Sequence, residues 1–65
     1  MKIKYFQQTD TLYIELRDAK VVATRDLDEN TQIDVDAQGA MCAITIERAK
    51  QRTDVPNLSF EQVAA

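Results

Sequence analysis

Apolar residues recur at every second position through most of the first fifty residues, and this period of two limits the fold more than any other feature. Successive side chains of a β-strand point to opposite faces, so the pattern predicts strands with one apolar face rather than helices. The alternation is clearest at Leu12, Ile14 and Leu16. We predict five strands, over residues 2–6, 11–17, 21–27, 31–36 and 40–48.

Short polar segments separate these strands and predict tight turns. Residues 36–39 have the chemistry of a type I turn, with Asp36 first and Gly39 fourth, and Gly39 is expected to adopt positive φ. In the strand over residues 21–27, either Val21, Ala23 and Leu27 or Val22 and Thr24 could point to the apolar face. A β-bulge, which inserts one extra residue, would reconcile the two patterns.

The last fifteen residues are more polar and contain one helix signal. Ser59 followed three residues later by Gln62 matches a capping box, which predicts a short helix over residues 60–63. A helix this short is marginal in water, so it requires its apolar residues to dock on the rest of the chain.

The expected fold is mainly β: an antiparallel five-stranded meander over residues 1–50, curled or stacked, with a C-terminal extension over residues 51–65. The class becomes α+β if the short helix forms. One sheet face is predicted to carry the apolar set Ile3, Tyr5, Leu12, Ile14, Leu16, Ile33, Val35, Cys42, Ile44 and Ile46. A single sheet cannot bury its own face, so we expect cover from the C-terminal segment, from curling, or from a second copy.

A domain of 65 residues is usually stabilised by disulfides, a bound metal ion or oligomerisation, and the sequence lacks the residues for the first two. Cys42 is the only cysteine and there is no histidine, which excludes an internal disulfide and the common structural zinc sites. Of the means that usually stabilise so small a domain, oligomerisation remains, so we expect a homodimer or larger homo-oligomer. A single thiol also fits a reducing cytosol, and we expect a cytoplasmic protein.

The charge pattern argues against two classes of partner. The net charge is −3 and the basic residues are scattered, so nucleic acid is not an expected partner. No stretch approaches the length of a membrane span, so no membrane role is expected.

The order and spacing of several short motifs resemble a known family. Residues 1–5 (MKIKY) and 10–16 (DTLYIEL), with later matches at 33–36, Gly39, 44–46 and Ala49, resemble a prokaryotic domain-of-unknown-function family, numbered twenty-two eighty-three. The resemblance implies a small cytosolic protein, and it implies an antitoxin-like or partner-binding role for some members encoded beside toxin-like proteins. This chain departs from the family pattern at Phe6, Ala43 and Thr45.

Two acidic residues form the only candidate metal site. Asp34 and Asp36 lie two apart on a predicted strand, so they share a face where carboxylates could bind Ca²⁺ or Mg²⁺. The alternative is a solvated strand face, with Asp36 beginning its turn. No cofactor is expected.

Four large side chains are candidates for contact with a partner: Tyr13, Phe6, Met41 and Phe60. Tyr13, Phe6 and Met41 are predicted on the outer face of the sheet, where they would form a binding patch or a small cluster under the C-terminal segment. Cys42 lacks a histidine base and is expected to be a small buried hydrophobe.

These features favour a non-enzymatic protein-interaction module that acts as a homodimer, and the resemblance implies an antitoxin-like role in which it binds a neighbouring-gene protein. The alternative is a divalent-metal or small-ligand binder that uses the acidic strand face. An enzyme is not expected, because general acid–base work would require a strongly shifted carboxylate or lysine.

Overall fold

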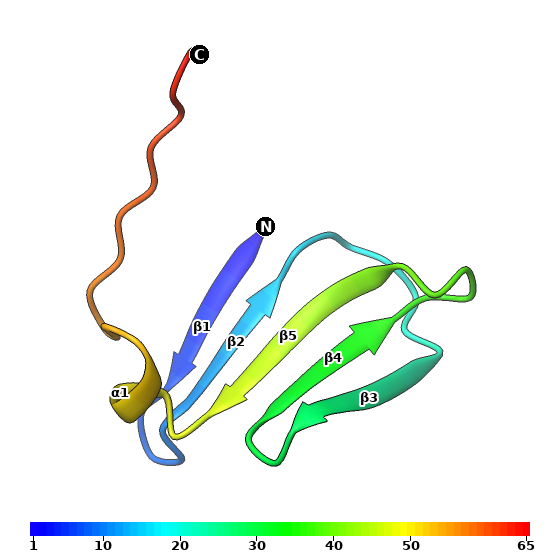
Figure 1. The fold of residues 1–65 in the computed structure, drawn as a ribbon, viewed down its shortest axis with the longest axis horizontal. Coiled ribbons are helices and arrows are strands. Elements are labelled where there is room, and N and C mark those ends of the chain that lie inside the picture. Colours follow the sequence, from blue (N-terminus) through cyan, green and yellow to red (C-terminus); the bar gives the residue numbers. More distant parts are fainter.

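The computed structural model describes all 65 residues and consists of one open antiparallel sheet with a short helix at one end (Figure 1). The five strands and the helix are β1 (Lys2–Phe6), β2 (Thr11–Glu15), β3 (Ala23–Asp28), β4 (Thr31–Val35), β5 (Met41–Glu47) and α1 (Ala49–Arg52). The prediction of a mainly β fold with five antiparallel strands is confirmed.

The strand order differs from that of a meander. It is β1-β2-β5-β4-β3, so the link from β2 to β3 steps across to the far edge and β5 lies between β2 and β4. The meander prediction assumed that consecutive strands are neighbours, which holds most often but not always. β5 is the longest strand and lies at the centre of the sheet, where it pairs with β2 on one side and β4 on the other. It includes the buried residues Cys42 and Ala43.

Two irregularities adjust the strand register. One lies in β3 between Asp26 and Asp28, as the ambiguous facing predicted. The other lies between β4 and β5, where Asp34 pairs with Ala43 but the next residue, Val35, pairs with Met41. Cys42 is therefore an extra residue in β5 with no partner on β4. The predicted turn between these strands is confirmed, since the Gly39 N–H donates to the Asp36 carbonyl at 3.0 Å and Gly39 has φ of 80°.

The helix is not where the sequence predicted it. Residues 60–63 are extended and exposed, and the helix forms directly after β5 instead. The first turn of the sheet holds it there: the Asp10 carbonyl accepts the Ala49 N–H at 2.9 Å, and the Asp10 carboxylate accepts the Lys50 N–H at 3.0 Å. Residues 60–63 form no hydrogen bond with the rest of the chain, so the capping-box helix lacks the tertiary contacts that a one-turn helix needs.

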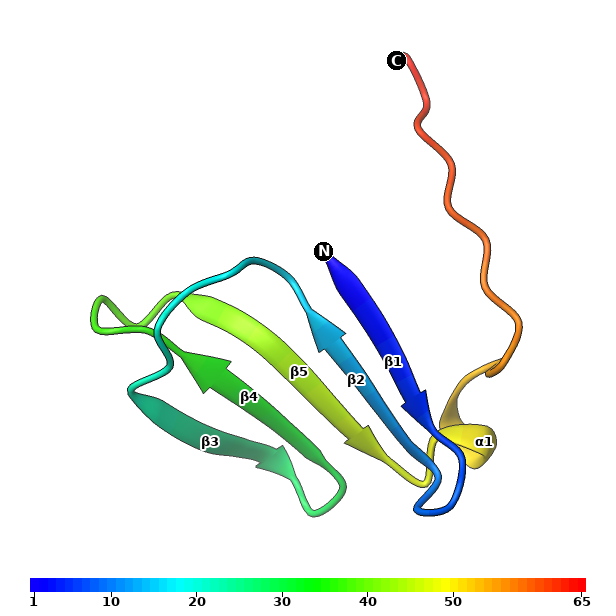
Figure 2. The ribbon, with the colours of Figure 1, turned by 180° about the vertical axis from the view of Figure 1, so that it is seen from behind.

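The molecule is flat for its size, and Figure 2 shows the other side of the same open sheet. Its principal extents are 35 × 33 × 17 Å and its Cα radius of gyration is 12.9 Å. A compact domain of this length has a radius of gyration of about 11 Å. No second layer covers the sheet, and no helix has the length and apolar character needed to cross a bilayer.

Candidate functional site

One face of the sheet carries a continuous row of isoleucines. Ile3 pairs with Ile14, Ile14 pairs with Ile44, and Ile44 pairs with Ile33, so the row crosses β1, β2, β5 and β4 without interruption. Cross-strand partners point to the same face of an antiparallel sheet. We call this surface the isoleucine face. On β3 the partner of Ile33 is Arg25, so the row of isoleucines ends there.

None of the four isoleucines is buried. Ile3 is 42% exposed, and the other three are half-buried. A fully buried isoleucine contributes roughly 1.5–3 kcal/mol, so this row leaves much of its stabilising potential unused in the single chain.

A second row on the same face is better covered. It runs through Tyr5, Leu12, Ile46 and Thr31, closer to α1, and Leu12 and Thr31 are buried. The predicted apolar face is thus largely confirmed by the register. The exception is at the end of β5, where the extra residue Cys42 shifts the alternation.

The opposite face is polar. Its cross-strand rows are Lys2–Glu15–Ala43–Asp34–Thr24 and Lys4–Tyr13–Thr45–Gln32–Asp26. Two side-chain hydrogen bonds bind β3 to β4 there: Thr24 Oγ1 donates to Asp34 at 2.7 Å, and Gln32 Nε2 donates to Asp26 at 3.1 Å. Most side chains in these rows are polar and can bond to water, so the continuous apolar row of the sheet lies on the isoleucine face.

The four predicted contact residues do not form one patch. Tyr13 and Phe6 lie on the polar face, where partial burial and the nearby Asp34 and Glu15 carboxylates raise the pKa of Tyr13. Met41 was expected on that face too, but its pairing with Val35 places it on the isoleucine face. Phe60 lies in the extended C-terminal segment and is 83% exposed.

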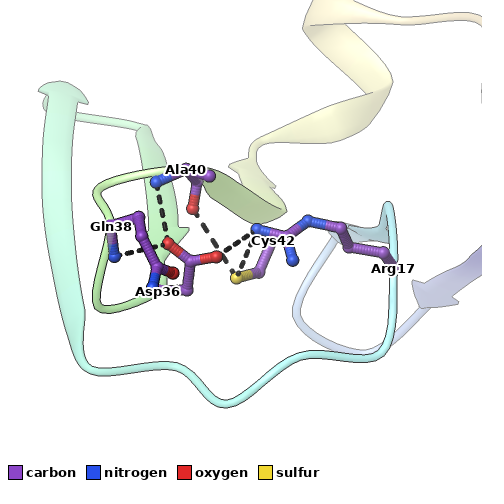
Figure 3. Close-up of polar contacts among 5 residues, drawn as sticks. All are labelled: Arg17, Asp36, Gln38, Ala40 and Cys42. Atoms are coloured by element: carbon purple, nitrogen blue, oxygen red, sulfur yellow. Dashed lines mark hydrogen bonds and ion pairs between the residues drawn. The ribbon is translucent and has the colours of Figure 1, made fainter.

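The two predicted metal ligands have other partners. Asp36 begins the β4–β5 turn, where its carboxylate accepts the N–H groups of Gln38 at 3.0 Å and Ala40 at 2.9 Å (Figure 3). Asp34 accepts the Thr24 hydroxyl. No group of three or more histidine, cysteine, aspartate or glutamate side chains is placed to hold a metal ion.

An ion pair that the sequence analysis did not identify holds the crossover in place. The Arg17 guanidinium, just after β2, binds the Asp36 carboxylate and lies 3.8 Å from Cys42 Sγ (Figure 3). The Arg17 hydrogen bond, with the two turn amides, lowers the pKa of Asp36. Nineteen positions separate the pair in sequence, so strand periodicity gave no signal for it.

Cys42 is buried, as predicted, with its thiol 3.7 Å from the Ala40 carbonyl oxygen. It lies at the bulge beside Arg17, with no histidine or other base to activate it. The cluster of Arg17, Asp36 and Cys42 therefore joins the crossover to the β4–β5 turn.

The comparison with known families agrees with the sequence motifs. A family model described as a protein of unknown function (DUF2283) matches residues 2–50, which span all five strands and the start of α1. No curated protein and no solved structure matches the chain. Residues 51–65 lie outside the family match.

Proposed function

We propose, starting from the fact that this chain belongs to the DUF2283 family of proteins of unknown function, that it is a non-enzymatic protein-interaction module that acts as a homodimer. In the proposed dimer, the isoleucine faces of two copies pack against each other. Two sheets packed face to face lie about 10 Å apart, and their inward side chains form a shared core.

The single observation that carries the proposal is the row of Ile3, Ile14, Ile44 and Ile33, in which Ile3 is exposed and the other three are only partly buried. Four adjacent isoleucines on a flat sheet form a contiguous apolar strip, and contiguous strips of this kind mark interaction surfaces on soluble proteins. The polar face offers no such surface, because charged and hydrogen-bonded side chains cover it.

The accessible area supports the same proposal. The chain exposes 5256 Å². A compact 7.4-kDa monomer exposes about 4,200 Å². The chain therefore exposes about 1,000 Å² more than a compact monomer would, and each partner in a standard complex buries about 800 Å².

The alternative occupant of the isoleucine face is a different protein with an apolar patch of its own. The family resemblance suggests an antitoxin-type pairing with the product of a neighbouring gene. The divalent-metal alternative has less support, because Asp34 and Asp36 already accept hydrogen bonds from Thr24 and from the β4–β5 turn.

Sedimentation equilibrium over nanomolar to micromolar protein concentrations tests the proposal. We expect a monomer–dimer equilibrium, and a monomer at every concentration would refute it. Co-expression with the neighbouring gene product separates the two occupants: a stable one-to-one complex formed at the expense of the homodimer would favour the different protein.

A further inference from the structure

The C-terminal segment leaves the sheet without a partner of its own. Beyond α1 it runs outward past the edge strand β1, in both views of the molecule (Figures 1 and 2). No hydrogen bond joins residues 58–65 to the rest of the chain. The segment nevertheless carries three large apolar side chains, Leu58, Phe60 and Val63, which are 69%, 83% and 73% exposed.

A cleft lies where this segment departs from the sheet. Its floor is Ile3, Tyr5, Leu12 and Ile14 on the isoleucine face, and its wall is the backbone turn over residues 53–58. Its volume is about 320 Å³. Since an apolar cavity of about 150 Å³ accommodates benzene, this cleft has room for a phenyl ring and a second apolar side chain.

We propose that residues 58–63 of each copy cross to the other copy of the dimer, where Phe60 enters the cleft over β1 and β2. The proposal rests on the proposed self-association and adds to it a definite occupant for the cleft. The crossing accounts for two observations: the cleft is open in the single chain, and three apolar residues of the C-terminal segment are exposed to solvent.

The dimensions of the segment permit the crossing. Six extended residues span about 20 Å, and two packed sheets are separated by about 10 Å. The cleft and the segment are adjacent on each copy, so a two-fold axis generates both exchanges at once, as in an isologous dimer. The segment needs no refolding to reach the partner, because it is already extended.

The same copy's cleft is a poorer destination for Phe60. Leu58 belongs to the cleft wall, and the chain is directed away from the sheet when it leaves that wall. Phe60 follows two residues later, so its return would require a sharp reversal between them.

A pair of full-length variants tests the role of the segment. In sedimentation equilibrium, the double substitution Phe60→Ser and Val63→Ser should raise the dimer dissociation constant at least about ten-fold, because it removes the two side chains that dock. The matched control Gln62→Ser, in the same segment, should leave it unchanged. Circular dichroism should show the same strand content in both.

The failures of the two proposals are distinguishable. A wild-type monomer would overturn both. A dimer whose dissociation constant is unaffected by the double substitution would overturn the crossing and leave the self-association standing.

Isotope-filtered nuclear Overhauser spectra of a dimer mixed from labelled and unlabelled copies test the direction of the exchange. We expect contacts between the Phe60 ring of one copy and the Ile3 and Ile14 methyls of the other. Contacts of Phe60 with these methyls within a single copy, and none between copies, would overturn the proposal.

Discussion

Ile14 on β2 lies directly opposite Ile44 on β5, at the junction between the N-terminal hairpin and the three strands that follow the crossover. The pair holds the two parts of the sheet together and also forms the centre of its open apolar row. In the proposed dimer, this pair would contribute both to the fold of each copy and to the contact between copies.

Substitution of Ile33 by lysine should weaken the dimer. Ile33 ends the isoleucine row on β4, and a lysine there would place a charge in the proposed interface at a cost of several kcal/mol. We expect the dissociation constant to rise at least about 100-fold in sedimentation equilibrium. The control Gln32→Lys adds the same charge to the polar face beside Asp26 and should have little effect; equal effects of the two variants would contradict the assignment of faces.

Replacement of Gly39 by alanine should destabilise the protein by about 1 kcal/mol, because Gly39 has φ of 80° and an L-residue is strained there. No atom lies within 4 Å of the position a Cβ would take, so strain and not a clash sets the cost. Gly39→Asn should lose less, since asparagine tolerates this conformation. Urea denaturation measures both, and equal losses would point to crowding instead.

The Arg17–Asp36 pair should make stability fall in acid. The pKa of Asp36 is lowered in the folded state, so its contribution is complete above the unfolded value of about 4 and is lost as the pH falls through the folded value. Asp36→Asn lacks this contribution. The difference in melting temperature between wild type and variant should be largest at neutral pH and should shrink below about pH 4; a constant difference would contradict the account.

Asp10→Ala should destabilise the protein by about 2 kcal/mol, since it removes the acceptor for the Lys50 N–H and puts alanine at φ of 55°. Asp10→Asn retains an acceptor oxygen and should lose less in urea denaturation. The alanine variant should also lower the pKa of Tyr5, which the hydrogen bond to Asp10 raises. An unchanged Tyr5 titration would show that this hydrogen bond is absent in solution.

Millimolar Ca²⁺ or Mg²⁺ should not raise the melting temperature. A cation that binds only the folded state would stabilise it, but the Asp34 and Asp36 carboxylates already accept hydrogen bonds. Differential scanning fluorimetry with and without each ion measures the effect. A concentration-dependent rise that Asp34→Asn abolishes would revive the metal-binding alternative.

The local features of the fold could be predicted from the sequence, because they depend on neighbouring residues. Alternation of apolar side chains located all five strands, and the chemistry of Asp36 and Gly39 defined the tight turn between β4 and β5. The bulge in β3 was also expected, since neither phase of that strand satisfied the apolar pattern.

The features that were wrong or unforeseen depend on contacts between distant residues. The position of β5 beside β2 follows from the pairing of Ile14 with Ile44, which the pattern within either strand cannot specify. The helix position follows from Asp10, forty residues before Lys50. Met41 was placed on the wrong face because one extra residue, Cys42, reverses the alternation at the end of β5.

Arg25 places a positive charge at the β3 end of the isoleucine row, which bears on how the proposed dimer could extend further. It stands on the edge strand β3 and points to the same side as the isoleucines, at the outer end of their row. Flush pairing of this edge with another sheet would bring a guanidinium into an apolar layer, and inward-pointing charges of this kind discourage open-ended strand addition. In the proposed dimer, Arg25 would therefore disfavour continuation of the apolar layer beyond the β3 edge.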